Sequence, residues 1–312
     1  MSSVAIKCSA CKRRAPFFHR VYSGERLCKR CFAESIEEKV RATIAKYKML
    51  DYNDHVAVAV SGGKDSISLL QVLAKMERKY PRATLVAVTV DEGIKGYRDE
   101  AMEIAQSNCK KLGIKHHSVS FKQLYGYTLD EIVERIREKA NQLTPCAFCG
   151  VLRRKALNIA AMDVRANKIA TGHTLDDEVQ TSLLNIFHGD IPKLAVEKPV
   201  TDQVHPRLVQ KIKPFCEVPE HESALYAYVK GVSFQSTPCP YAGEAMRNDI
   251  RNLVNRIEER HAGAKFTVFK SIEKLRPAIA TLAEKGEFKE CKKCGDPSAG
   301  ELCMACQLLK QV

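Results

Sequence analysis

Hydrophobic positions in the middle of the chain follow two periods, one typical of strands and one of helices. Short apolar runs predict buried strands at residues 55–60, 83–93, 115–121 and 168–174. Apolar residues at helical spacing predict helices at residues 33–50, 65–79, 97–112, 128–142, 150–166 and 175–188. Strands that alternate with helices are typical of a doubly wound parallel sheet, so we predict an α/β fold.

The pattern loosens after residue 189, where prolines recur. Two further helices are predicted there, a short one at 223–231 and a longer one at 243–263 that carries basic residues at about helical spacing. Doubly wound sheets bind their ligands beyond the carboxyl ends of the strands. Three polar segments follow predicted strands in this way, and we expect them to converge on one site: "SGGKDS", "VDEG" and "TGHTLDD".

Composition restricts the class of protein. The chain has 312 residues, of which 45% are hydrophobic and 28% charged, which is ordinary for one large globular domain or two medium ones. No run of about 18 uncharged apolar residues occurs, so we expect no membrane span. The N-terminus lacks the apolar stretch of a secretory signal, and we therefore predict a cytoplasmic protein.

The chain is basic, with a formal net charge of +13. Residues 1–50 alone hold 12 basic and 4 acidic side chains. A basic block of this kind favours a polyanionic partner, most simply nucleic acid. The alternative is a solvated basic face with no partner.

Eight of the 13 cysteines form two pairs of C-x2-C knuckles at the ends of the chain. The two sets are Cys8, Cys11, Cys28 and Cys31, and Cys291, Cys294, Cys303 and Cys306. In a reducing compartment such spacing indicates metal rather than disulfides. Four thiolates suit a closed tetrahedral Zn²⁺ site, so we predict two zinc ribbons, with a rubredoxin-like iron site as the alternative. The predicted domains are residues 1–34 and 276–312 for the ribbons and 35–275 for the catalytic domain.

The segment Ser61–Ser66 lies between a predicted strand and a predicted helix. Paired glycines let a backbone approach a phosphate, and the helix N-terminus attracts its charge. Lys64 adds a cation, and Asp65 adds a carboxylate that suits Mg²⁺. The segment is not a Walker A loop, because that motif needs glycine where Val58 stands and a hydroxyl where Asp65 stands. A glycine turn without a ligand is the alternative.

Cys146, Cys149 and the distant Cys239 are a further set of three. Three thiolates suit an iron–sulfur cluster that leaves one iron without a protein ligand. Two other interpretations stay open, a cysteine persulfide resolved as a disulfide and a third structural zinc. Cys109 and Cys216 have no partner by spacing and are predicted core thiols.

Several motifs together give the chain a specific resemblance. They are the two knuckle pairs, "SGGKDS", "CAFCGVLRRKAL", "ATGHTLDDEVQT" and "TPCPY". The chain resembles the tRNA 2-thiolation enzymes of the TtuA/NcsA type, which are PP-loop ATP pyrophosphatases. The resemblance implies that ATP-Mg²⁺ binds at the phosphate loop, that uridine O2 is adenylated, and that sulfur then displaces AMP. It also implies that Cys146, Cys149 and Cys239 hold a [4Fe–4S] cluster whose fourth iron binds sulfide.

The resemblance further implies which residues bind the nucleotide. They are Val60, Ser61, Gly62, Gly63, Lys64, Asp65, Ser66, Val90, Asp91, Gly172, His173 and Asp177. Lys64 and Asp177 are also predicted to be catalytic, together with the three cysteines. For Asp176 and Asp177 the alternative is helix capping, and for His173 it is an ordinary packing or hydrogen-bonding role.

Departures from the family pattern bear on the substrate. Many relatives have Asn where Thr174 stands, and some bacterial-type relatives place a lysine just after the C-x2-C-G segment. Here residues 151–154 are Val, Leu, Arg and Arg. This favours the branch that acts on the wobble uridine at position 34, with uridine 54 as the nearer alternative. Arg153 and Arg154 are expected either to meet phosphates of tRNA or AMP, or to be plain surface charge.

The expected partners are tRNA and a sulfur donor, either free sulfide or a ubiquitin-like sulfur carrier protein, and the resemblance implies a homodimer. Two other functions are alternatives to thiolation. Another PP-loop enzyme, such as an amide-forming synthetase or a lysidine-type ligase, has no evident use for the three cysteines. A zinc-ribbon RNA-binding scaffold would not release pyrophosphate.

Overall fold

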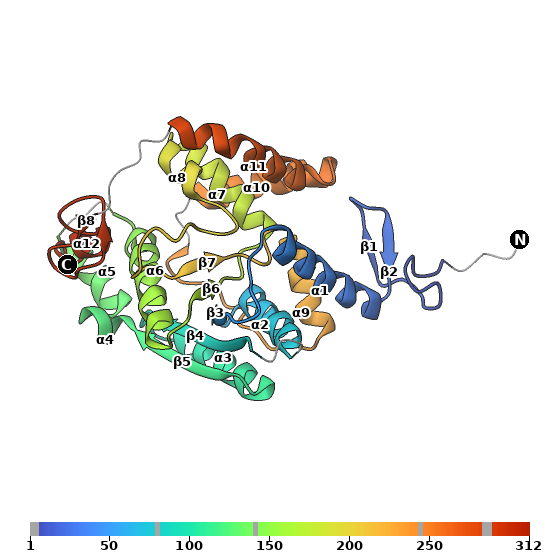
Figure 1. Cartoon of the computed structure of the whole chain (residues 1–312), viewed down its shortest axis with the longest axis horizontal. Helices are drawn as coiled ribbons and strands as arrows, with labels where there is room; N and C mark the ends of the chain where they lie inside the picture. The colour runs from blue at the N-terminus through green and yellow to red at the C-terminus, as the bar shows by residue number, and fades with distance from the viewer. Residues whose placement is uncertain (1–5, 79–81, 140–142, 243–245, 283–288) are drawn as a thin grey trace, which may run out of the picture.

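The computed structural model describes residues 6–78, 82–139, 143–242, 246–282 and 289–312. A five-stranded parallel sheet lies at the centre, with helices on both faces (Figure 1). Its strand order is β5-β4-β3-β6-β7. Successive strands are added on one side of β3 up to β5 and on the other side from β6 onward, which is the doubly wound order and confirms the predicted α/β fold. The strands are β3 (His55–Ala59), β4 (Thr84–Asp91), β5 (Lys115–Ser120), β6 (Lys168–Ala170) and β7 (Gln210–Ile212).

The helices occupy most of the remaining chain. They are α1 (Lys29–Lys46), α2 (Lys64–Glu77), α3 (Arg98–Leu112), α4 (Phe121–Tyr125), α5 (Leu129–Glu138), α6 (Pro145–Asp163), α7 (Leu175–Phe187), α8 (Ile191–Val196), α9 (Glu220–Val229), α10 (Met246–Arg260), α11 (Ala264–Leu282) and α12 (Met304–Leu309). Helices α7, α8, α10 and α11 form one group beside the sheet (Figure 1).

Alternate residues of the central strands supply two hydrophobic cores. Val56 and Val58 of β3 face a core that includes α1, α2 and α9, whereas Ala57 faces a core that includes α5 and α6. Val86 and Val88 of β4 belong to the second core. Strands that are buried on both faces read as continuous apolar runs, which is why these strands were predictable from the sequence.

The two ends of the chain form small cysteine-bearing units at opposite ends of the molecule (Figure 1). The N-terminal unit contains the hairpin β1 (Phe18–Arg20) and β2 (Glu25–Leu27), and the C-terminal unit contains β8 (Lys289–Glu290), β9 (Pro297–Ser298) and α12. The predicted domain limits at 34 and 275 fall inside α1 and α11, so the division into three domains stays a prediction.

Several predicted elements differ at their ends. Helix α1 begins at Lys29, four residues before the predicted start, because Cys28 already has the extended backbone of an N-cap. Strand β6 ends at Ala170 rather than at residue 174, because Thr174 caps the next helix. The prediction missed strand β7 and helices α4, α8, α11 and α12. Residue 79, residues 140–142 and residues 243–245 of predicted helices lie outside the described residues. Within the described residues no helix is long and apolar enough to cross a bilayer.

Candidate active site

The phosphate loop joins the carboxyl end of β3 to the N-terminus of α2. The backbone N–H and the hydroxyl of Ser61 both lie 3.1 Å from Ser66 Oγ, which donates to Gly63 O at 3.0 Å. Gly63 is the N-cap of α2 and has no side chain to cap the helix. No side chain therefore caps the first N–H groups of α2, and a helix N-terminus of this kind suits a phosphate.

At two positions of the site the neighbouring atoms leave room only for glycine. Gly62 has a φ of +88°, and a Cβ there would lie 2.7 Å from Ala101 O. A Cβ on Gly172, in the loop after β6, would lie 2.9 Å from Ser66 N. The loop after β6 thus presses directly against the start of α2, and any side chain at Gly172 would displace one of the two loops.

Lys64 and Asp65 form an ion-pair group with Glu220 at the start of α9. Lys64 Nζ lies 2.8 Å from Asp65 Oδ2 and 2.8 Å from Glu220 Oε1. Burial opposes the charge of Lys64, but the two carboxylates outweigh it and raise the lysine pKa. Burial raises the pKa of Asp65, and Lys64 opposes this rise. Sequence reasoning missed Glu220, which lies 156 residues from Lys64.

Asp177 and His173 follow β6. Thr174 donates its backbone N–H and its hydroxyl to Asp177 Oδ2, each at 2.9 Å, which completes a capping box at the start of α7. Asp177 lines the cavity as well, so capping does not exclude the predicted role. His173 Nδ1 lies 2.8 Å from Thr171 Oγ1, and loss of hydration at the cavity wall together with Lys213 lowers the histidine pKa.

Asp176 has a structural role. Its Oδ2 accepts the backbone N–H of Glu220 at 2.7 Å, and its Oδ1 pairs with Lys265. These contacts cap α9 and tie α7 to α11, whereas the capping alternative for this residue concerned the start of α7, which Thr174 and Asp177 cap instead.

The end of β4 contributes a residue that the sequence did not single out. Asp91 Oδ1 accepts the backbone N–H of Gly93 at 2.8 Å, so this carboxylate closes a turn. Glu92 is 4% exposed and lies between two arginines. Its carboxylate lies 2.7 Å from Arg98 Nε and 2.8 Å from Arg153 Nε.

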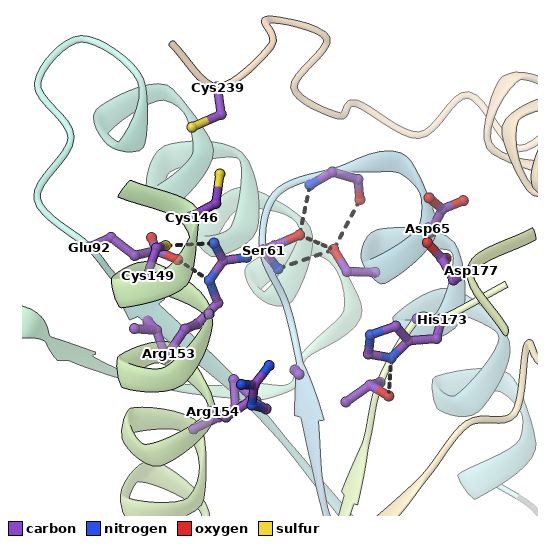
Figure 2. Close-up of a pocket in the computed structure, with 18 of the residues that line it drawn as sticks. Ser61, Asp65, Glu92, Cys146, Cys149, Arg153, Arg154, His173, Asp177 and Cys239 are labelled. Carbon is purple, nitrogen blue, oxygen red and sulfur yellow. Dashed lines mark hydrogen bonds and ion pairs between the residues drawn. The ribbon is translucent and has the colours of Figure 1, made fainter. Parts of the chain in front are cut away.

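These two arginines connect the phosphate loop with the cysteines. Arg98 donates to Ser61 O at 3.0 Å and to Val90 O at 2.6 Å. Arg153 donates to Cys149 Sγ at 2.8 Å (Figure 2). A continuous path of polar contacts thus runs from the phosphate loop through Arg98, Glu92 and Arg153 to a cysteine.

The three cysteines Cys146, Cys149 and Cys239 line the same cavity. Cys146 and Cys149 start α6, and Cys239 approaches from the opposite segment (Figure 2). Burial raises the pKa of Cys149, and Arg153 opposes this rise. In each terminal knuckle set the sulfur atoms lie within 4.8 Å of one another. The sulfur atoms of Cys146, Cys149 and Cys239 do not all lie within that distance of one another. Soft thiol donors spread in this way fit a multi-iron group better than a single zinc ion.

The cavity has a volume of about 740 Å³ and reaches from the phosphate loop to the cysteine wall. Nine of the predicted nucleotide residues line it: Val60, Ser61, Gly63, Asp65, Ser66, Val90, Gly172, His173 and Asp177. Gly62, Lys64 and Asp91 lie outside the lining, because Gly62 packs on Ala101, Lys64 turns to Glu220 and Asp91 closes its turn.

The terminal cysteines form two compact sets, each with its four sulfur atoms within 4.8 Å of one another. Backbone N–H groups, that of Cys303 first, lower the pKa of the Cys291 thiol to about 6. Lys155 on α6 lies 2.9 Å from Cys294 Sγ and 2.6 Å from Asp296. The C-terminal set is thus docked on the helix that carries Cys146 and Cys149. Cys109 and Cys216 are buried core thiols, as predicted.

Comparisons with known proteins agree with this geometry. Residues 32–258 match the PP-loop domain family. The cytoplasmic tRNA 2-thiolation protein 1 of Chlamydomonas reinhardtii is 38% identical over 97% of this chain and 84% of its own. The tRNA-5-methyluridine(54) 2-sulfurtransferase of Pyrococcus horikoshii is 35% identical over 97% of this chain and 93% of its own. The structure of the U34-tRNA thiolase NcsA from Methanococcus maripaludis with its [4Fe–4S] cluster superimposes with a TM-score of 0.84, at 34% identity over 99% of this chain and 97% of that one.

The fold, the phosphate loop and the family match define a PP-loop ATP pyrophosphatase. Within that class the chain belongs to the family of tRNA 2-thiolation proteins, the tRNA sulfurtransferases. The predicted resemblance and the predicted enzyme class are confirmed.

Proposed function

We propose that this chain is an ATP-dependent thiolase that replaces O2 of the wobble uridine of tRNA, position 34, with sulfur. One observation carries the proposal. The phosphate loop at the start of α2 and the three cysteines of α6 and residue 239 line a single cavity of about 740 Å³. An activated oxygen and an incoming sulfur atom would therefore meet in one place, as a two-step replacement requires.

The first step activates the oxygen. The open N–H groups of α2, with the hydroxyls of Ser61 and Ser66, would hold the phosphates of ATP. Asp65 would bind Mg²⁺, with Asp177 beside it, while Lys64 keeps Asp65 in position. Uridine O2 attacks the α-phosphorus and pyrophosphate leaves. The carbon at position 2 then carries AMP as a leaving group.

The second step brings sulfur from the opposite wall. Hydrosulfide adds to carbon 2, the bond to O2 breaks, and AMP leaves with the oxygen. Cys146, Cys149 and Cys239 would hold a [4Fe–4S] cluster, which when bound supplies an iron with an open coordination position. Arg153 fixes Cys149 through its N–H group and is itself held by Glu92. A persulfide on one of these cysteines, without a cluster, is the alternative that uses the same wall.

Position 34 is favoured over position 54 by the segment after Cys149. Residues 151–154 contain two arginines and no lysine. Arg153 forms an ion pair with Glu92 and a hydrogen bond with Cys149. The relative from Pyrococcus horikoshii keeps position 54 as the second candidate. Both uridines lie in loops, where a base enters a pocket without the cost of breaking a pair.

The remaining assignments belong to the same proposal. We assign Zn²⁺ to the two terminal cysteine sets, because four thiolates close a tetrahedral site. The predicted homodimer and the sulfur donor, free sulfide or a ubiquitin-like carrier, stay predictions. A cytoplasmic location is supported by the name of the Chlamydomonas relative.

To test this, the anaerobically reconstituted protein is incubated with two tRNA transcripts. In one, uridine 34 is changed to cytidine, and in the other, uridine 54 is changed to cytidine. ATP, Mg²⁺ and sulfide are supplied, and nucleosides are measured by mass spectrometry. We expect 2-thiouridine only where uridine 34 remains. Product formed only on the transcript that retains uridine 54 would overturn the choice of position, and binding without pyrophosphate release would favour the scaffold.

A further inference from the structure

Arg154 differs from its neighbour Arg153 in what it contacts. Arg153 is bound to Glu92 and to Cys149. Arg154 forms no ion pair and no hydrogen bond with any residue that the structure describes, and neither does the amine of Lys211 on β7. Figure 2 shows the side chain of Arg154 projecting from α6 toward the middle of the cavity, away from Cys149.

The two unpaired cations share one place in the molecule. Both line the main cavity, and both also line a second cavity of about 330 Å³. The second cavity runs from this shared boundary past residues 201–209 to Asp296 and Cys303 of the C-terminal cysteine unit. The two cavities therefore share a boundary, and that boundary carries two unpaired positive charges.

The surroundings do not neutralise these charges. The carboxylate of Glu197 opposes the fall in pKa that burial causes in both Arg154 and Lys211. Glu197 forms its ion pair with Lys213, however, and Lys213 also lies 2.8 Å from Glu178. Burial lowers the pKa of Lys211, and Arg154 lowers it further. An unpaired arginine and an unpaired lysine at one cavity wall suit an anion, because charge-assisted hydrogen bonds to carboxylate or phosphate are strong.

We propose that Arg154 and Lys211 bind a backbone phosphodiester of the RNA, next to the uridine that enters the main cavity. This proposal rests on the proposed function. A phosphate is favoured because arginine and lysine are the usual partners of RNA phosphates. RNA is favoured over ATP because the start of α2 already offers a phosphate site, and because Arg154 and Lys211 also line the second cavity, which contains no residue of the phosphate loop.

The test measures the affinity of the full-length protein for an unmodified tRNA transcript over a range of KCl concentrations. The variants are Arg154→Gln, Lys211→Gln and the double variant. The matched control is Lys198→Gln, because Lys198 already pairs with Asp202 at 2.6 Å near the same cavity. Affinity for MgATP is measured on the same samples without RNA, and circular dichroism confirms that each variant is folded.

We expect each single variant to reduce the slope of log affinity against log salt concentration by about 0.7, and the double variant by about twice that, since each removes one contact to a single-stranded phosphate. Arg154→Lys and Lys211→Arg should keep the wild-type slope. MgATP affinity should stay within about twofold.

Two outcomes overturn the proposal. Slopes equal to that of Lys198→Gln would show that no RNA phosphate binds there. A loss of MgATP affinity with unchanged RNA binding would assign the two cations to the nucleotide. This test is independent of the thiolation assay. If the wild-type protein binds tRNA but makes no 2-thiouridine, the proposed function fails, and the salt dependence of the variants still shows whether Arg154 and Lys211 bind an RNA phosphate.

Discussion

Glu92 and Arg153 join the two halves of the active site, with Glu92 Oε1 2.8 Å from Arg153 Nε. The same arginine reaches Cys149 Sγ at 2.8 Å, and the same glutamate holds Arg98, which binds the carbonyl oxygen of Ser61. The cysteine wall and the phosphate loop are therefore oriented by one buried carboxylate. Contacts to a residue one step behind a metal ligand fix the position and the basicity of the ligand, and Glu92 would have that role toward Cys149 in the proposed cluster site.

Replacement of Glu92 by Gln should reduce both iron retention and thiolation by roughly tenfold to a hundredfold, the usual effect of losing a residue behind a ligand. Iron per chain after anaerobic reconstitution and 2-thiouridine formation are the two measurements. Arg153→Lys keeps the charge but loses the forked geometry, so an intermediate effect is expected. Glu301→Gln is the control, because Glu301 pairs with Lys292 on the surface. Wild-type iron content in Glu92→Gln would refute the positioning role.

Lys64→Ala should abolish pyrophosphate release while tRNA affinity stays within a few-fold. The lysine holds Asp65 beside the phosphate loop, and its loss leaves that half-buried carboxylate without its cation. Pyrophosphate release and tRNA binding are measured on the same preparation, with Lys198→Gln as the control. A large loss of tRNA affinity would contradict the assignment of Lys64 to the nucleotide.

Gly172→Ala should weaken MgATP binding by roughly tenfold to a hundredfold, because small displacements of a positioned group have effects of that size. The added Cβ would lie 2.9 Å from Ser66 N and would push the loop after β6 away from α2. Gly300→Ala is the control, since a Cβ there meets nothing within 4 Å. Equal MgATP affinity in both variants would mean that the close approach of the two loops is unimportant.

Metal analysis tests the terminal cysteine sets. The protein should hold about two zinc ions per chain, and Cys8→Ser and Cys291→Ser should each remove one, since a closed site needs all four thiolates. Cys109→Ser changes a buried thiol outside both sets and should leave the zinc content unchanged. Zinc content that survives both changes would show that these cysteines do not bind the metal.

Local patterns in the sequence predicted the central strands, the phosphate loop and the two terminal cysteine sets, because each depends on residues close in sequence. Strand β7 was missed, since it has three residues and lies at the edge of the sheet. Helix α11 was missed, and it contains Pro277, which favours a helix end in sequence reasoning.

Within the segment "VDEG" the predicted site residue was Asp91, whereas the structure shows that Glu92 makes the contacts to Arg98 and Arg153. Side chains alternate along a strand, so Glu92 shares the face of Val90, which packs in the core with α6. That alternation was a usable signal. Its partner Arg153 lies 61 positions away, and Lys64 and Glu220 are 156 apart, so neither pair is visible in a local pattern.

The most direct test of the account is 2-thiouridine formation by Cys239→Ala, measured anaerobically by nucleoside mass spectrometry with ATP, Mg²⁺, sulfide and tRNA. Cys239 is the cysteine that comes from outside α6 and completes the wall opposite the phosphate loop. We expect a brown wild-type protein that forms 2-thiouridine and a Cys239→Ala variant that forms none, although it still binds tRNA. A colourless wild-type protein, with thiolation that survives Cys239→Ala, would contradict the cluster and the central claim.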